Sequence, residues 1–480
     1  MSDLSLNPRA SQRLRTRGVL VLSVLALSLS ACTRPVLRAA DPVPVATTIP
    51  TQYDAPASTE ASIATIGWQD FFADAKLKQL IQLGLDNNRD LRTAALNIQR
   101  AQAQYQIRSA DQSPTVNASG SATVQGTKDN SNNSFQVGLG MAAYEIDLWG
   151  RVANLKDAAL QNYLASQSAQ QATQVALIGQ IAQSYLAIAF GQEQLRLAEQ
   201  TLKAQEESLN LNRKRLNVGI SSAVPVRQGE ISVETARLAI SNAKTQLAQD
   251  RNTLALLLGQ GVPDNLMPSS IPAPLLSKDV LSTGLPSDLL RNRPDVAQAE
   301  YSLKAAGANI AAARAAFYPT ISLTGNLGLS STSLSDLFKS GAFSYSAGPS
   351  ISVPIFDAGA RQANLEVSKV DQQIALNNYE KAIQSAFKDV ADVLATRATL
   401  QERLDAQARL VKATQATYEL SQARYKAGLD NYLSVLDAQR SLFSVQQAQI
   451  SLEQSALLSQ VNLYKALGGG AVVEQTTAKQ

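Results

Sequence analysis

The sequence predicts a mainly helical protein with a membrane β-barrel, in which one structural unit occurs twice along the chain. Three observations support this prediction. Two segments of about 67 residues have a helical composition with almost no Gly or Pro, four shorter segments alternate apolar and polar residues, and the second half of the chain restates the first. Each unit is expected to contain a helix, two strands, a long helix, a turn and a second long helix.

The duplication sets the expected domain boundaries. Arg151 returns as Arg361 and Gly219 returns as Gly428, each about 210 residues later along the chain. Repeat 1 is expected over residues 67–268 and repeat 2 over residues 285–470. A flexible tail is expected over residues 471–480.

The first 31 residues are expected to be a signal peptide. Arginines precede an apolar run over residues 18–31, which is too short for a membrane-spanning helix. The run ends in Leu29-Ser30-Ala31-Cys32, which resembles the lipobox of bacterial lipoproteins, and Cys32 is the only cysteine. Cys32 is therefore the expected lipid-attachment site, and Thr33 after it implies sorting to the outer membrane. An ordinary signal peptide with an incidental cysteine is the alternative.

The segment after the cysteine, residues 32–66, is rich in Pro, Ala and Thr and is expected to be an extended, lipidated tether. Four long helices are expected further along the chain, at about residues 151–217, 225–258, 361–427 and 430–467. At 1.5 Å per residue, residues 361–427 correspond to about 100 Å of helix, which needs packing partners along its whole length. Leu404, Val411, Tyr418 and Tyr425 recur at heptad spacing, which is typical of a coiled coil.

Four β-strands are expected, at about residues 114–126, 134–147, 319–330 and 343–356. In the third, Ile321, Leu323 and Leu327 lie on one face, and polar residues occupy the other. Each strand is long enough to cross a membrane with an apolar outside and a polar lumen, although a half-buried sheet of a soluble sandwich shows the same pattern. Four strands cannot close a membrane barrel, since single-chain barrels begin at about eight strands, so several chains must share one barrel.

The composition excludes several classes of enzyme. The 480 residues include 43 Lys and Arg, 39 Asp and Glu, and no His. Without histidine there is no imidazole base, no Ser/His/Asp or Cys/His nucleophile and no histidine-ligated metal. We therefore expect no enzyme activity, no metal site and no cofactor. The net charge of +4 also argues against nucleic acid as a partner.

Several blocks of sequence resemble the signature blocks of the outer-membrane factor family, which includes OprM and TolC. The blocks are Gly284-Leu285-Pro286-Ser287-Asp288-Leu289-Leu290, Arg293-Pro294-Asp295-Val296, residues 313–325, Pro354-Ile355-Phe356-Asp357, residues 435–442 and, in repeat 1, residues 144–151. They are most similar to OprM-like efflux outer-membrane lipoproteins. Residues 88–94 and 394–398 also resemble the AdeK branch.

This resemblance implies a homotrimer, in which three chains form a twelve-stranded barrel in outer-membrane lipid, continuous with an α-helical coiled-coil tunnel in the periplasm. It implies the passive exit duct of a tripartite multidrug efflux pump, joined through a periplasmic adaptor to an inner-membrane RND transporter. Two alternatives stay open. One is a type I secretion duct of the TolC kind, and the other is a structural coiled-coil lipoprotein or periplasmic adaptor.

Residues around the turn between the two long helices of repeat 2 are the candidate periplasmic gate. Asp430, Leu433 and Asp437 are spaced i, i+3 and i+7, so they are expected on one face of a helix and would form rings around a trimer axis. Resemblance to OprM implies that Leu433 and Asp437 form the constriction, which Arg424 and Tyr425 help to latch closed. Alternatively, Asp430 caps the helix and Asp437 is a solvated charge.

The two turns themselves are the candidate docking points for the adaptor. Gly219 and Gly428 are expected to adopt the left-handed backbone conformation that reverses the chain. The resemblance implies that the same turns face the adaptor, which makes candidates of Val218-Gly219-Ile220 and Ala427-Gly428-Leu429.

Overall fold

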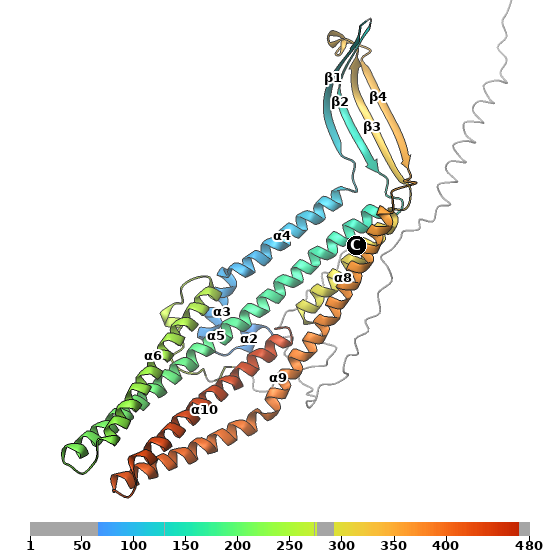
Figure 1. The fold of residues 1–480 in the computed structure, drawn as a ribbon. Helices are drawn as coiled ribbons and strands as arrows, with labels where there is room; N and C mark the ends of the chain where they lie inside the picture. Colours follow the sequence, from blue (N-terminus) through green and yellow to red (C-terminus); the bar gives the residue numbers. More distant parts are fainter. Residues whose placement is uncertain (1–65, 129, 273, 276–291, 470–480) are drawn as a thin grey trace, which may run out of the picture. The chain divides into compact units, whose positions relative to one another are not determined.

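A computed structural model describes residues 66–128, 130–272, 274–275 and 292–469. The expected signal peptide, the lipid-attachment site Cys32 and residues 470–480 lie outside these ranges. The described part of the chain contains the expected succession of elements twice (Figure 1). The mainly helical fold with four antiparallel strands is therefore confirmed.

The two repeats have matching elements. Repeat 1 contains α4 (Arg89–Ala110), β1 (Val116–Thr127), β2 (Asn130–Glu145), α5 (Arg151–Asn217) and α6 (Val224–Leu258). Repeat 2 contains α8 (Pro294–Ala315), β3 (Thr320–Ser331), β4 (Phe343–Ser352), α9 (Ala360–Lys426) and α10 (Tyr432–Ala466). Short helices α2 (Trp68–Phe71) and α3 (Ala75–Asn87) precede α4 within the expected range of repeat 1. The 3-10 helix η2 (Asp264–Leu266) follows α6, and η3 (Leu334–Asp336) lies between β3 and β4.

The chain divides into two compact units. One contains the four strands together with the adjoining ends of α4, α5, α8 and α9, and the other contains most of the long helices. In the strand unit the sheet order is β1-β2-β3-β4, so β1 and β4 are its edges. Apolar residues face apolar residues across β3 and β4, as at Ile321 and Ile351, and the hydroxyls of Ser322 and Ser350 meet at 2.8 Å. The alternation of apolar and polar residues in the sequence therefore corresponds to an apolar face and a polar face of this sheet.

β4 ends at Ser352, earlier than residue 356, where the sequence analysis ends it. Ser352 pairs with Thr320, which is the first residue of β3, so β4 has no partner residue in β3 beyond this point. The other strands end within a few residues of their expected bounds.

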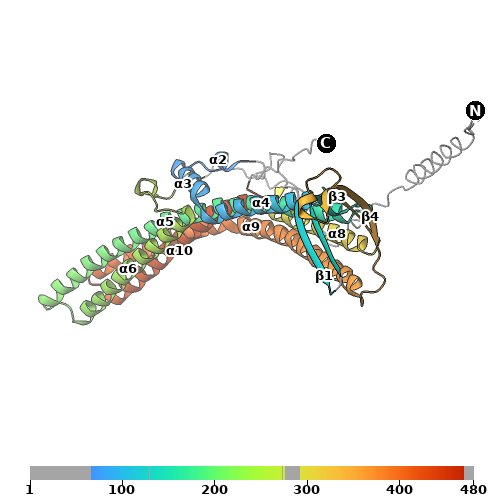
Figure 2. The ribbon, with the colours of Figure 1, turned by 90° about the horizontal axis from the view of Figure 1, so that it is seen from above.

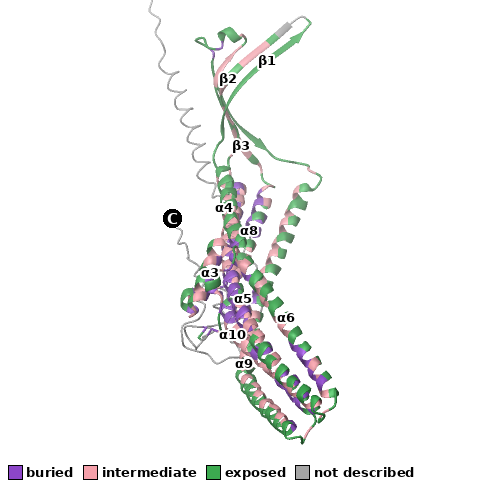
Figure 3. Cartoon of the chain, turned by 90° about the vertical axis from the view of Figure 1, so that its left-hand side faces the viewer, coloured by how far each residue is buried: buried purple, intermediate pink, exposed green. Residues whose placement is uncertain are grey.

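The core of the helical unit lies where α3, α5 and α10 meet. Figure 3 shows buried residues gathered along α5 and α10. The largest fully buried side chains of this core are Phe72, Leu77, Leu80, Ile81, Ile178, Ile181, Tyr185, Leu186, Ile188, Phe190 and Tyr464. An 18-residue window of α5 is apolar enough to cross a membrane, but 67% of it is buried inside the molecule, as expected for a core helix.

Both repeats end by the same contact. In repeat 1 the side-chain amide of Asn88 donates to the carbonyl of Leu257 at 2.9 Å, and in repeat 2 the guanidinium of Arg293 donates to the carbonyl of Ala466 at 3.0 Å. These two pairs occupy equivalent positions of the duplicated sequence. The two repeats therefore match down to individual hydrogen bonds. In each repeat, this bond joins the end of the last long helix, α6 or α10, to the residue that precedes the first helix of the repeat, α4 or α8.

The glycines that follow α6 and α10 allow this closure. Gly468 has a φ of 99°, and a Cβ atom placed on it would lie 2.4 Å from the carbonyl oxygen of Asn292. Gly259 has a φ of 67° and the same close approach, 2.4 Å, to the carbonyl oxygen of Asn87. Glycine is needed at both positions, because it adopts the left-handed conformation without strain and has no Cβ atom to collide with the neighbouring carbonyl oxygen.

Candidate gate at the helical tips

The α5–α6 and α9–α10 hairpins end in turns of the same geometry, and the two turns lie beside each other in the helical unit (Figure 2). Gly219 and Gly428 have φ values of 75° and 76°, as the sequence predicted. In each turn the residue after the glycine donates its amide to the carbonyl four residues before the glycine, at 3.0 and 2.9 Å respectively. This is the Schellman ending of a helix, which satisfies carbonyls that would otherwise lack partners.

The turns present apolar side chains to the surface. Val218, Ile220 and Leu429, three of the expected docking residues, are 70%, 71% and 68% exposed. Ala427 is exposed as well. The tip of the helical unit therefore carries apolar surface without cover in the described chain.

Tyr425 ties the second hairpin to the first. Its hydroxyl, in a side chain that is only 7% exposed, donates to the amide oxygen of Asn212 in α5 at 2.6 Å. Arg215 donates to the carbonyl of Tyr425 at 3.3 Å and lies over its ring at 4.6 Å. The ring of Tyr432 packs 5.3 Å away and its oxygen accepts from Ser208 at 3.2 Å. We call the hydrogen bond between Tyr425 and Asn212 the tyrosine latch.

Arg424 does not take part in this contact. Its guanidinium pairs with Asp430 in its own turn, through hydrogen bonds of 2.6 and 2.9 Å. These hydrogen bonds from Arg424, together with its charge, lower the pKa of the Asp430 carboxyl. The pair fixes the turn and does not connect the two hairpins.

The expected position of Asp430 on a helix is wrong. α10 begins at Tyr432, and its N-cap is Asn431, whose side-chain oxygen accepts from the amide of Ser434 at 3.1 Å. Asp430 therefore precedes the helix and neither caps it nor shares a helical face with Leu433. The ion pair with Arg424 explains this placement, because it holds Asp430 back in the turn.

Leu433 and Asp437 do share a face of α10. Leu433 is 46% exposed and Asp437 is exposed, whereas Val435 and Leu436 on the opposite side are buried against Tyr425 and Tyr432. Within the described residues the Asp437 carboxylate has no hydrogen-bond or ion-pair partner. The structure thus leaves one apolar and one acidic side chain free on the surface next to the tyrosine latch.

Sequence reasoning did not find Asn212 and Ser208, which hold the two tyrosines. Both lie inside α5, where a polar residue gives no local sign of a contact with another hairpin. The heptad spacing of Tyr418 and Tyr425 was the available signal, since it places both on one face of α9.

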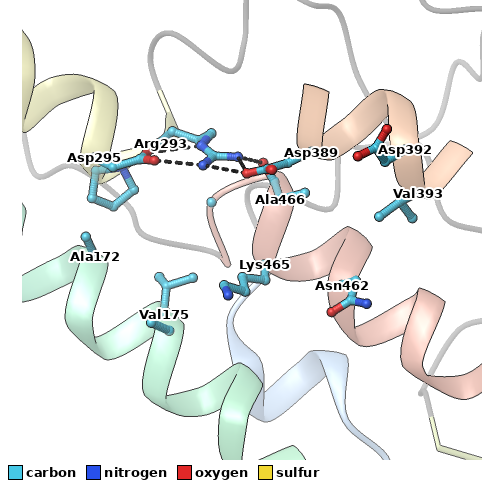
Figure 4. A pocket seen from close by; sticks show the side chains of 13 residues that line it. Ala172, Val175, Arg293, Asp295, Asp389, Asp392, Val393, Asn462, Lys465 and Ala466 are labelled. Atoms are coloured by element: carbon cyan, nitrogen blue, oxygen red, sulfur yellow. Dashed lines mark hydrogen bonds and ion pairs between the residues drawn. The ribbon is translucent and has the colours of Figure 1, made fainter. Parts of the chain in front are cut away.

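A second polar cluster surrounds Arg293, which is 8% exposed and lines a cavity of about 400 Å³. Figure 4 shows its guanidinium reaching between Asp295 of α8 and Asp389 of α9. It donates to Asp295 at 3.0 and 2.7 Å and to Asp389 at 3.1 Å. Burial opposes the charged form of Asp295, but the hydrogen bonds and charge of Arg293 outweigh it and lower the pKa of this carboxyl.

Each acidic group that lines this cavity forms an ion pair with a basic side chain of the protein. Asp295 and Asp389 pair with Arg293, and Asp392, at the far side of the cavity, pairs with Lys388 at 2.5 Å. Over the described ranges, no group of three or more acidic, His or Cys side chains could hold a metal ion. The cluster is therefore a structural brace between α8, α9 and α10.

The sequence profile of outer membrane efflux proteins matches residues 80–260 and again residues 285–469. The chain belongs to the outer membrane efflux protein family. Membership makes it an outer-membrane channel and not an enzyme, as the sequence predicted.

Individual relatives support this assignment over nearly the whole chain. The antibiotic efflux pump outer membrane protein ArpC of Pseudomonas putida is 44% identical over 476 residues, which cover 97% of this chain and 98% of ArpC. The probable outer membrane lipoprotein SilC of Salmonella typhimurium is 40% identical over 411 residues, covering 85% and 88%. The open state of the Neisseria gonorrhoeae MtrE outer membrane channel has a TM-score of 0.81 at 38% identity, covering 89% of this chain and 96% of that one.

Proposed function

We propose that the chain is the exit duct of a tripartite RND-type multidrug efflux pump and that it conducts drugs or other small molecules passively across the outer membrane. The observation that carries the proposal is the pair of exposed residues, Leu433 and Asp437, beside a latch that joins the two hairpins. The names of relatives, which include antibiotic, toluene and solvent efflux pump proteins, support small molecules as the cargo.

The working form is a homotrimer. Among the described strands, β1 and β4 are the edges of the sheet and each pairs on one side only, so β4 of one chain can pair with β1 of the next. Three chains then close a twelve-stranded barrel, which is wide enough for a polar channel. The long helices continue it as a coiled-coil tunnel in the periplasm.

The gate is formed by rings of Leu433 and Asp437 from the three chains. The leucines narrow the channel, and the carboxylates make its closed end favour cations over anions. Opening requires α9 and α10 to move away from α5, which breaks the tyrosine latch. Arg424 and Asp430 keep the turn itself intact, because their ion pair lies within it.

The apolar tip turns dock the periplasmic adaptor, which connects the duct to the inner-membrane RND transporter. Val218-Gly219-Ile220 and Ala427-Gly428-Leu429 supply exposed apolar contacts for this. Cys32 is lipidated and anchors the chain to outer-membrane lipid. Within the family we place the chain among the OprM-like lipoproteins and in the AdeK branch, on the blocks over residues 88–94 and 394–398.

The test is efflux of a fluorescent dye, together with antibiotic susceptibility, in a strain lacking the gene. Deletion should abolish efflux and wild type should restore it, whereas a Gly428→Pro variant should restore it poorly because it distorts the docking turn. Unchanged efflux on deletion, with loss of a secreted protein, would replace the proposal by a type I secretion duct.

A further inference from the structure

Helix α6 carries a row of apolar side chains that are exposed in the single chain. Val224, Ile231 and Leu238 follow one another at intervals of seven residues, so they lie along one side of the helix. They are 60%, 61% and 66% exposed. The opposite side of α6 is buried, because Val226 and Val233 pack in a cluster with side chains of α5. We call the three exposed residues the α6 stripe.

The α6 stripe has the form of a helix-packing surface. Single apolar residues on a protein surface are common, but large apolar residues that recur at heptad spacing form the seam of a coiled coil. At 1.5 Å per residue the stripe runs for about 21 Å along the helix. It begins beside the tip turn, five residues after Gly219. The stripe is therefore long enough to pack against a second helix that lies along it.

Helix α9 carries another exposed apolar row, near the second tip turn. Leu410 and Leu420 are 47% and 65% exposed. Ala413 and Thr417 lie between them at helical spacing on the same side and are exposed as well. We call these four residues the α9 stripe. Its two large side chains are separated by two small ones, so a large side chain of a partner helix would fit between the leucines.

The two stripes match in height when the tip turns are level. Because α6 leads away from its turn and α9 leads toward its turn, the two helices would pack antiparallel. The members of the α6 stripe lie 5, 12 and 19 residues after Gly219, and the leucines of the α9 stripe lie 8 and 18 residues before Gly428. One leucine therefore falls between the first two members of the α6 stripe, and the other lies beside the third. Ile231 then faces Ala413 and Thr417.

The two stripes do not meet within one chain, since both stay exposed although the hairpins are in contact. That contact uses other residues. Tyr425 of α9 bonds to Asn212 of α5 in the tyrosine latch, and Phe443 of α10 and Ala236 of α6 line one cavity between the hairpins. Each stripe is therefore available to another molecule.

The proposed trimer supplies a partner for each stripe. In a closed ring of three chains, repeats 1 and 2 alternate, so the second hairpin of one chain has the first hairpin of the next chain as its other neighbour. We propose that α9 of one chain packs along α6 of the next chain, with the α9 stripe against the α6 stripe. This inference rests on the trimer proposed above and names the surfaces that join its chains in the helical unit.

Disulfide cross-linking tests this contact in the full-length lipoprotein, whose only cysteine, Cys32, is the expected lipid-attachment site. Ile231→Cys combined with Thr417→Cys places one thiol on each stripe, at nearly the same distance from the turns. After oxidation of membranes with copper phenanthroline, these chains should run as covalent dimers and trimers on a non-reducing denaturing gel. Ile231→Cys combined with Ala398→Cys is the matched control. Ala398 is exposed on α9 but lies about 27 Å further from the turn than Ile231, so this pair should leave monomers.

An amine-reactive cross-linker applied to the same variants separates this contact from the trimer itself. Amine-linked trimers without the disulfide would overturn the proposed contact and leave the trimer standing. A disulfide between the two engineered cysteines of one chain, found at monomer size, would overturn it in the same way. Absence of amine-linked trimers would overturn both the contact and the trimer.

Thiol labelling decides between a second chain and the periplasmic adaptor as the occupant of the α6 stripe. In the trimer without adaptor, the single Ile231→Cys thiol should lose most of the maleimide labelling that it shows in the denatured protein. Val218→Cys, in the docking turn, should stay labelled until the adaptor is added. Full labelling of the Ile231→Cys thiol in the trimer, with protection only when the adaptor is added, would overturn the proposal and assign the stripe to the adaptor.

Discussion

Replacement of Tyr425 by Phe should open the resting channel. The change removes one hydroxyl and the 2.6 Å hydrogen bond to Asn212, whose side chain is completely buried. Loss of a hydrogen bond to a buried acceptor costs about 1–3 kcal/mol. If the open state separates the hairpins, the bond exists only in the closed state, so the whole cost falls on that state. The ratio of open to closed channels should then rise by about 5- to 150-fold.

Single-channel recording in planar bilayers measures this ratio directly. Tyr418→Phe is the matched control, since Tyr418 lies one heptad earlier on α9 and is half-buried. Within the described residues, its hydroxyl has one hydrogen bond, which it accepts from Gln422 of its own helix at 3.3 Å. The control should conduct as the wild type does.

A double-mutant cycle decides whether the latch itself is responsible. Asn212→Ala alone should open the channel to a similar extent as Tyr425→Phe, and the double variant should add little to either. Open probability of Tyr425→Phe equal to wild type, or fully additive effects of the two changes, would refute the reasoning.

Three further changes test other features. Leu433→Ala with Asp437→Ala should raise the resting conductance and reduce cation preference, because both the narrowing side chain and the charge are lost, and an unchanged current-voltage curve would contradict the proposed gate. Gly428→Ala should lower the free energy of unfolding by about 1 kcal/mol, since the positive φ of Gly428 is the only obstacle to a Cβ atom there. Gly468→Ala should cost several times more, because its Cβ atom would also collide with the carbonyl oxygen of Asn292. If thermal unfolding shows Gly428→Ala to be the less stable variant, the close approach at Gly468 is unimportant. Arg293→Met should flatten the acid dependence of stability. Arg293 lowers the pKa of Asp295 in the folded wild type, so ionised Asp295 stabilises the fold at pH values above its unfolded pKa of about 3.9. This stabilisation disappears as the pH falls through the lower, folded pKa. Identical acid unfolding of the wild type and the variant would contradict this prediction.

Much of the fold could be predicted because its signals are long and repeated. The absence of Gly and Pro over residues 361–427 predicts a helix, and α9 spans Ala360–Lys426. The alternation in β3 and its neighbours likewise gives the sheet, because side chains on a strand point to opposite faces in turn.

The site was less predictable, for two physical reasons. Asp430 and Asn431 are adjacent and both are good helix caps, so spacing alone does not say which one begins α10, and the ion pair with Arg424 decides it. The tyrosine latch joins residues that are 213 positions apart, and nothing near Asn212 in the sequence indicates its partner.

The free edges of the sheet also bear on how the protein is made. Two strands of the chain, β1 and β4, are the edges of the sheet, and neither pairs on its outer side with another strand of the described residues. Such edges pair readily with any exposed strand, including that of an unrelated protein. If the chain assembles as the proposed trimer, each chain is at risk of aggregation until its edges are paired. The yield of channels should then depend on how quickly chains meet at the outer membrane relative to the time that they spend unassembled.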